Sequence, residues 1–311
     1  MHVIDDKAIA RAGIHASDLV EPVSLALAAH AKGEMVVEPK HMLIAKTGAY
    51  AIGTHGIWGN RDLTFFHNLV GLDREPVKGQ RSTYRSSQVL FRSSDATPLL
   101  MIHGNTMSSV LPVVMTIITA QHFAPINAQT ISFIGVGLQA KLHLNALAQM
   151  YPITRIFCYS RSQHSAMALV EHAESLGIKT EICMDPRSAV SQGDIVISAI
   201  SESFGVKPFL DTDWLKPHAF LSSVDMLRPW LRGSNLRPLV IADDALQAQQ
   251  MIKANRVPNT FSIDHELGAL LADRKSTHGR DKSPVILLHP GCCAGLFGMA
   301  IGLQTHPLLT D

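Results

Sequence analysis

Apolar and polar positions follow two different patterns along this chain, and the change comes near residue 110. Between about residues 130 and 295, short apolar runs typical of buried strands alternate with segments of helical spacing. This alternation predicts an α/β domain built on a doubly wound, mostly parallel sheet. The predicted strands span 131–134, 155–159, 179–184, 194–200, 219–224, 239–242 and 285–288. Helices are predicted at 141–148 and 166–176, and a short one begins near Asp185.

The first 110 residues predict a different architecture. A helix is expected over 17–31, with Ser17 as its cap. Strand-like pieces follow at 35–45, 49–54, 63–70 and 88–91. Together they predict an antiparallel α+β domain. The apolar segment 113–122, with Pro112 in its first turn, predicts a helix that links the two domains. The small apolar residues 294–303 are expected to pack against that helix.

Length and composition limit the class of protein. At 311 residues the chain exceeds a typical single core, so we expect two domains, 1–112 with 296–311 and 113–295. The 27 basic and 26 acidic residues form no block of like charge, which leaves no electrostatic case for a nucleic-acid or membrane partner. No secretory pattern and no run of about twenty apolar residues is present. The four cysteines and sixteen histidines lack metal-ligand spacing, so we expect no metal and a cytoplasmic enzyme.

The most informative motif lies where the first parallel strand ends. The apolar run breaks into Gly135-Val136-Gly137-Leu138-Gln139-Ala140 and a helical segment follows. Gly135 permits a tight turn, Gly137 lets a pyrophosphate approach the backbone, and Ala140 allows close packing of helix on strand. The phosphates would lie on the free amides at Leu138 and Gln139. The motif predicts a dinucleotide site of the Rossmann type, and the alternative is a purely structural turn.

The tip of the second strand bears on which dinucleotide binds. An NAD-selective fold usually places Asp or Glu there to accept hydrogen bonds from the ribose 2′-hydroxyl. Here the strand ends in Ser160-Arg161-Ser162, which can donate to a 2′-phosphate and pair with its charge. The sequence therefore favours NADP, with NAD still open. The alternative is that Arg161 is a solvated residue at a helix start.

Taken together, these features resemble the ornithine cyclodeaminase/mu-crystallin family, of which this chain would be a divergent member. The resemblance covers nearly the whole chain and rests on the glycine motif, Trp214-Leu215-Lys216-Pro217, Arg228-Pro229, Asp243, Gln247-Ala248, Glu266-Leu267-Gly268 and Gly279-Arg280. It implies a homodimer with an N-terminal substrate and dimerisation domain and an NAD(P)-binding Rossmann domain. It also implies chemistry through an imine: cyclising deamination of ornithine, reduction of cyclic ketimines, or reversible amino-acid dehydrogenation.

The resemblance also implies positions for the cofactor and departures at the substrate. Cofactor contacts are expected at Thr83, Ile200, Ser201, Val224, Asp225 and Met226. Family enzymes grip the substrate carboxylate with cations, one of which falls near Lys40. A family lysine falls at Asn68 and a family arginine at Leu111, where no cation remains. The aspartate that handles protons in the cyclodeaminases falls at Leu227.

Leucine cannot replace a planar guanidinium fork, and a carboxylate left unpaired in a dry site is costly. Three explanations therefore stay open. The substrate lacks that carboxylate, another cation such as Arg85 or Arg228 holds it, or catalysis has been lost. Arg85 lies in the polar run 81–87, which is used near the nicotinamide in the family. That run is equally compatible with a surface strand.

Two residues are candidates for moving protons. Asp225 follows a parallel strand, where open α/β sheets bind ligands, and a desolvated carboxylate there can act near neutral pH. An aspartate after a strand is also often only a cap for the next turn. His67 lies on an otherwise apolar strand, where a satisfied, half-buried histidine is the more common outcome.

Three function classes follow. The first is an NADP-dependent oxidoreductase that acts on a small imine, ketimine or amino acid. The second is a cyclodeaminase-type lyase with bound NAD, which the leucine at 227 disfavours. The third is a protein that binds cofactor without catalysis, as in the crystallin branch of the family.

Overall fold

The computed structural model describes residues 1–72, 83–200, 206–273 and 283–309. Within these limits the chain forms two compact units, which we treat separately. Unit 1 contains Met1–Val114, Gly268–Asp273 and the C-terminal segment from Cys292. Unit 2 contains Met115–Leu267 and the segment that ends at Gly291.

Unit 1 is built on a seven-stranded sheet, mostly antiparallel, in the order β1-β7-β6-β5-β4-β2 with β3 also paired to β4. Its strands are β1 (His2–Asp5), β2 (Val36–Val37), β3 (His41–Ile44), β4 (Ala49–Trp58), β5 (Leu63–Leu72), β6 (Thr83–Arg92) and β7 (Pro98–Gly104). Its helices are α1 (Asp6–Arg11), α2 (Val20–Ala31), α9 (Cys293–Gln304) and all but the first residue of α8 (Leu267–Ala272). Short 3-10 turns cover Ala16–Leu19, Gly59–Arg61 and Pro307–Leu309. The antiparallel α+β prediction is confirmed, although β1 and β7 were not predicted.

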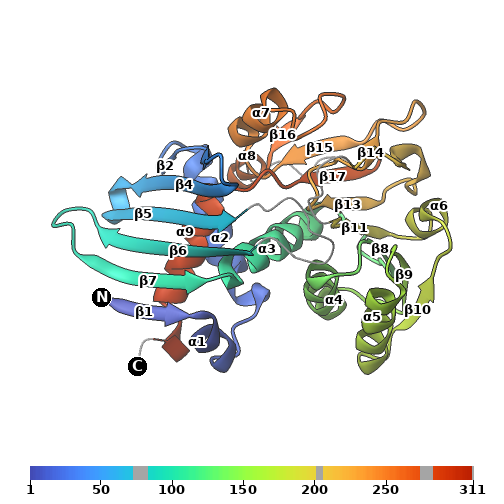
Figure 1. The fold of residues 1–311 in the computed structure, drawn as a ribbon, viewed down its shortest axis with the longest axis horizontal. Helices are drawn as coiled ribbons and strands as arrows, with labels where there is room; N and C mark the ends of the chain where they lie inside the picture. Colours follow the sequence, from blue (N-terminus) through green and yellow to red (C-terminus); the bar gives the residue numbers. More distant parts are fainter. Residues whose placement is uncertain (73–82, 201–205, 274–282, 310–311) are drawn as a thin grey trace. The chain divides into compact units, whose positions relative to one another are not determined.

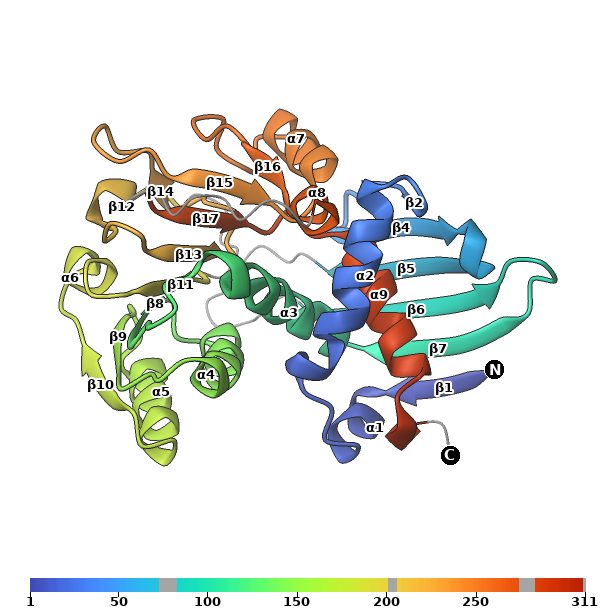
Figure 2. The same ribbon diagram turned by 180° about the vertical axis from the view of Figure 1, so that it is seen from behind.

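The core of unit 1 lies between the sheet and the pair α2 and α9, which pack against each other (Figure 2). Alternate residues of β5 face this core, and Phe65 stacks on Phe297 of α9 with ring centroids 5.1 Å apart. The main contacts of the C-terminal segment are therefore with α2 and the sheet, whereas the sequence predicted packing on the linking helix. Ser17 lies inside the 3-10 turn before α2 and caps nothing, because the chain enters α2 directly from that turn.

Helix α3 (Thr106–Phe123) begins well before the predicted start, so Pro112 lies inside it. The cause is a contact that is distant in sequence. The Asp6 carboxylate accepts hydrogen bonds from the backbone amides of Asn105 and Thr106, which supplies an N-terminal cap. These bonds hold the pKa of Asp6 below its ordinary value, although burial acts in the opposite direction.

Unit 2 is built on an eight-stranded, wholly parallel sheet in the order β10-β9-β8-β11-β13-β17-β15-β16 (Figure 1). These strands are β8 (Thr130–Ile134), β9 (Arg155–Tyr159), β10 (Lys179–Ile182), β11 (Ile195–Ser198), β13 (Phe220–Ser223), β15 (Leu239–Ala242), β16 (His265–Glu266) and β17 (Val285–Leu288). The helices are α4 (Leu138–Met150), α5 (Gln163–Ser175), α6 (Pro186–Val190) and α7 (Ala245–Lys253). A small ribbon of β12 (Leu210–Asp211) and β14 (Trp230–Leu231) and a 3-10 turn (Thr212–Trp214) complete the unit.

The doubly wound α/β prediction is therefore confirmed. The predicted strands at 239–242 and 285–288 have the observed bounds, whereas those at 179–184, 194–200 and 219–224 were too long. Strand order reverses between β8 and β11, and ligands bind at the carboxyl ends of the strands at such a point.

The sequence also predicted no membrane span. Within the described part of the chain, α3 is long and apolar enough to cross a membrane by length and composition, and 56% of it is buried. Thr116 on this helix bonds to side chains of unit 2, and the Tyr151 hydroxyl donates to the Ala120 carbonyl. These contacts are those of a core helix.

Candidate cofactor site

The turn from β8 into α4 leaves no room for a side chain at Gly135. This residue has φ +90°, and a Cβ there would lie 2.5 Å from the carbonyl oxygen of Ala199, just after β11. The Gly135 amide also donates to the Tyr159 carbonyl at 3.2 Å. Glycine at this position therefore lets the chain cross the switch point of the sheet.

Gly137 presents the opposite situation. It is the N-cap of α4 and supplies no side-chain cap, so the first turn of the helix is not capped from within. A Cβ at Gly137 would meet no atom of the described residues within 4 Å. Ala140 in the first turn is fully buried and brings the helix close to the strand. The space beside Gly137, at the positive end of a thirteen-residue helix, fits a dinucleotide pyrophosphate.

The tip after β9 presents two serine hydroxyls on either side of Arg161. The Ser160 hydroxyl oxygen accepts from the Ser162 amide at 3.1 Å, and the Ser162 oxygen caps α5 by accepting from the Ser165 amide at 3.2 Å. Both hydroxyl hydrogens therefore remain available to a phosphate. Arg161 is exposed between them, and the tip contains no carboxylate.

Asp225 is buried at the carboxyl edge of the sheet. Its carboxylate accepts from the hydroxyls of Ser198 and Ser223 at 2.6 and 2.7 Å, and from the Ile200 amide at 3.3 Å. Burial raises the pKa of this carboxyl, although the hydrogen bonds act in the opposite direction. The Ser198 oxygen also accepts from the Trp230 indole at 3.0 Å. Asp225 thus ties the ends of β11 and β13 together.

The residues after Asp225 form a tight turn. Met226 and Leu227 both have positive φ, and the Leu227 amide donates to the Ser223 hydroxyl at 2.8 Å. Leu227 is fully buried in the apolar core of unit 2. Arg228 is half-buried and its Nε donates to the Asp225 carbonyl at 3.0 Å, while Val224 is also half-buried.

The predicted substrate residues of unit 1 lie on several elements. Lys40, before β3, is half-buried; Arg85 on β6 and Asn68 on β5 are exposed. Leu111 on α3 is buried in the core. Thr83 begins β6. Some of the predicted residues lie outside the part of the chain that the structure describes. They are Ser201, Arg81 and Ser82 at the start of the polar run 81–87, and Gly279-Arg280.

His67 faces the core of unit 1, where its Nδ1 lies 2.9 Å from Nε2 of Gln88. Burial, and secondarily the charge of Lys40, lowers its pKa to about 3. A ring with that pKa is neutral near pH 7, so His67 is poorly suited to donate a proton as an imidazolium.

Sequence reasoning missed the partners of Asp225. Ser198 ends β11 and Ser223 ends β13, and they meet at Asp225 because these two strands are neighbours in the sheet; Trp230 in turn donates to Ser198. The available signal was weak: a small polar residue at the end of each of two buried strands.

Two other features bear on chemistry. Among the described residues no group of three His, Cys, Asp or Glu side chains is placed to hold a metal, and the four cysteines are buried and unbridged.

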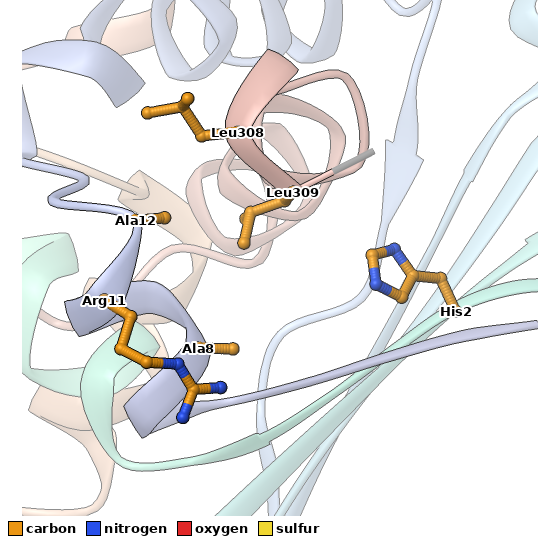
Figure 3. Close-up of a pocket in the computed structure, with 6 residues that line it drawn as sticks. All are labelled: His2, Ala8, Arg11, Ala12, Leu308 and Leu309. Carbon is orange, nitrogen blue, oxygen red and sulfur yellow. The ribbon is translucent and has the colours of Figure 1, made fainter. Parts of the chain in front are cut away.

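A surface hollow of about 370 Å³ lies in unit 1 between α1 and the C-terminal segment. It is lined by His2, Ala8, Arg11, Ala12, Leu308 and Leu309 (Figure 3). It contains none of the predicted site residues.

The two glycines give a matched test of the site. Gly135→Ala should lower the free energy of unfolding by about 2–4 kcal/mol, because the new methyl meets a backbone carbonyl at positive φ. Gly137→Ala should leave stability nearly unchanged and weaken nucleotide binding at least tenfold, because the methyl occupies the phosphate space. Chemical denaturation and calorimetric titration measure the two effects. Unchanged nucleotide affinity in Gly137→Ala would contradict the assignment.

Comparisons with known proteins bear on the family and the fold. Ketimine reductase mu-crystallin of Mus musculus is 22% identical over 199 residues, 63% of this chain and 62% of that protein. N-((2S)-2-amino-2-carboxyethyl)-L-glutamate dehydrogenase of Staphylococcus aureus is 25% identical over 316 residues, 93% of this chain and 88% of that protein. An archaeal alanine dehydrogenase dimer with bound NAD has a similar fold, with a TM-score of 0.81, 17% identity, and coverage of 98% of this chain and 95% of that one. The model of the ornithine cyclodeaminase/mu-crystallin family matches residues 4–229, and the chain belongs to this family.

Proposed function

We propose that this protein is an NAD(P)H-dependent oxidoreductase that reduces the C=N bond of a small imine or ketimine, or oxidises the corresponding amine. The observation that carries the proposal is the glycine cradle at the switch point, where Gly135 makes the turn and Gly137 leaves open space at the start of α4. Similar proteins are named ketimine reductase mu-crystallin and N-((2S)-2-amino-2-carboxyethyl)-L-glutamate dehydrogenase. The bound nicotinamide would supply or accept the hydride.

Charged residues of the chain would bind and orient the substrate. Lys40, Arg85 and Arg228 are the candidates for a substrate carboxylate, because Asn68 and Leu111 carry no charge. Asp225 is our candidate for holding a proton at the carboxyl edge, since burial raises its pKa, although its oxygens accept hydrogen bonds from two serine hydroxyls. We assign no proton transfer to His67, which is neutral and packed in a core.

A substrate screen tests the activity. Cyclic ketimine acids, keto acids with amines, and free amino acids would be offered with NADPH or NADP, and absorbance at the reduced nicotinamide band followed. We expect steady turnover with a ketimine or amino acid, and poor turnover of ornithine because Leu111 and Leu227 replace charged family residues. Ammonia release without net change in cofactor would indicate a lyase. Cofactor binding with no turnover across the screen would indicate a non-catalytic binding protein.

We also propose that NADP(H) binds more tightly than NAD(H). The tip Ser160-Arg161-Ser162 supports this, because it contains no carboxylate that would repel a 2′-phosphate. Arg161→Ala should weaken NADPH binding by about 1–3 kcal/mol, the scale of a charge-assisted contact. NADH binding should change little, because NADH has no 2′-phosphate. Calorimetric titration of NADPH and NADH into the unaltered protein and into Arg161→Ala measures the two affinities. Arg187→Ala, which removes an exposed arginine elsewhere on unit 2, is the control. Equal weakening of both cofactors would refute the assignment.

Finally, we propose a homodimer in which the open face of the unit 1 sheet pairs with its copy. The linking helix and the C-terminal helix, from which a dimer surface was expected, are buried within the protomer. The sheet face opposite α2 and α9 instead exposes Leu43, Ile57 and Val70, at 75%, 53% and 61%. Leu43 and Val70 both pair with Ala51 of β4, and Ile57 lies further along the same strand. Apolar patches on an exposed surface often mark a protein–protein interface.

The double variant Ile57→Asp/Val70→Asp should shift the protein from dimer to monomer, because two carboxylates would be buried against their copies. Multi-angle light scattering at micromolar concentration measures this. Met184→Asp is the matched control, since Met184 is 93% exposed on unit 2. A monomeric unaltered protein would exclude the dimer.

A further inference from the structure

A buried chain of hydrogen bonds in unit 2 connects the first turn of α4 with the end of β17. His143 Nδ1 lies 2.8 Å from the Gln139 carbonyl oxygen, and His143 Nε2 lies 3.0 Å from the Thr116 hydroxyl. Thr116 and Ser222 exchange a hydroxyl bond of 2.7 Å, and Ser222 lies 2.8 Å from Nε2 of His289. All four side chains are buried. The substrate and cofactor assignments above make no use of this chain.

The first bond sets the direction of the whole chain. A carbonyl oxygen only accepts, so His143 Nδ1 donates, and the other nitrogen of a neutral ring accepts from the Thr116 hydroxyl. The Thr116 oxygen then accepts from Ser222, and the Ser222 oxygen accepts from Nε2–H of His289. This order gives His289 the tautomer in which Nδ1 is an acceptor.

His289 Nδ1 has no hydrogen-bond partner among the residues that the structure describes, although the side chain is only 7% exposed. Burial, and secondarily His143, lowers the pKa of His289 to about 3, so the ring is neutral near pH 7. A buried acceptor without a donor is unfavourable, and native proteins generally provide one. The missing donor is therefore expected from a bound molecule.

The position of His289 narrows the choice of donor. The residue comes directly after β17, whose last residue, Leu288, lies opposite Ser223 of β13. It thus shares the carboxyl edge of the sheet with Asp225 and with the turn at Gly135. A ligand at this edge is the dinucleotide proposed above, and the N–H donor on its reactive end is the primary amide of the nicotinamide.

We propose that His289 Nδ1 accepts a hydrogen bond from the carboxamide N–H of the nicotinamide, and that Ser222, Thr116 and His143 are positioning residues that fix its tautomer. This inference rests on the proposed function, because it requires that a nicotinamide dinucleotide binds. An amine group of the substrate is the other N–H donor that could reach the same atom, and the test separates the two.

The test compares two cofactors without substrate. NADPH and its reduced 3-acetylpyridine analogue, in which a methyl replaces the amide nitrogen, would be titrated calorimetrically into the unaltered protein and into His289→Leu. For each protein we compare the ratio of its affinity for NADPH to its affinity for the acetyl analogue. This ratio should be about tenfold higher in the unaltered protein than in His289→Leu. In His289→Leu, affinity for the acetyl analogue should stay within about twofold. His289→Asn, which keeps an acceptor, should recover part of the preference, and Ser222→Ala should lose part of it.

The controls separate the outcomes. Arg161→Ala should weaken both cofactors alike and leave the ratio intact, because it acts at the adenosine end. Equal weakening of both cofactors in His289→Leu, or no change in either, would overturn the inference while leaving cofactor binding established. If neither cofactor affinity changes in His289→Leu, but the KM of the amino acid or amine found in the substrate screen rises, the donor is the substrate and the carboxamide assignment is wrong. Failure of the unaltered protein to bind any nicotinamide dinucleotide would overturn the proposed function and this inference together.

Discussion

The close approach of two backbone segments at Gly135 is the constraint on which unit 2 depends. The chain leaves β8, turns at Gly135 close to the carbonyl of Ala199 after β11, and begins α4 three residues later. A Cβ at Gly135 would force these neighbouring strands apart. The position of the α4 amides, and hence of any phosphate on them, follows from this contact. The open space at Gly137 matters for ligand binding only because the turn at Gly135 holds the helix in place.

Buried polar groups of unit 2 gather at the carboxyl edge of the sheet. There they stabilise the ends of the strands, and their polar atoms lie where a ligand is proposed to bind. Asp225 receives two hydroxyls and an amide, and His289 ends a chain of four buried side chains. Such networks are unfavourable unless nearly every donor and acceptor is paired. The exposed Ser160 to Ser162 tip follows a different principle, because its hydroxyls satisfy backbone amides and keep their hydrogens for a ligand.

The sequence predicted much of the architecture because its strongest patterns are local. The parallel strands 239–242 and 285–288, the turn at Gly135 and the N-cap of α6 at Asp185 all follow from short-range spacing. What it missed depends on contacts between distant residues. Asp6 caps α3 from about a hundred residues away, and the pairing of Thr116 with Ser222 spans a similar distance. Such contacts leave no periodic pattern in the sequence. The sequence therefore predicted Pro112 in the first turn of the helix, and it gave no sign of the role of His289 in a buried hydrogen-bond chain.

The leucines at 111 and 227 carry a further physical meaning. Both are buried, and Leu227 belongs to the apolar core of unit 2. An arginine or aspartate in either environment would be a buried charge, which is unfavourable unless it is paired. The resemblance to the family implies charged residues at these two positions, and a charge there would require different packing around it. Lys40, Arg85 and Arg228, by contrast, are half-buried or exposed. Any anionic group on the substrate must be met from such positions, and this is the physical reason to expect a substrate that differs from ornithine.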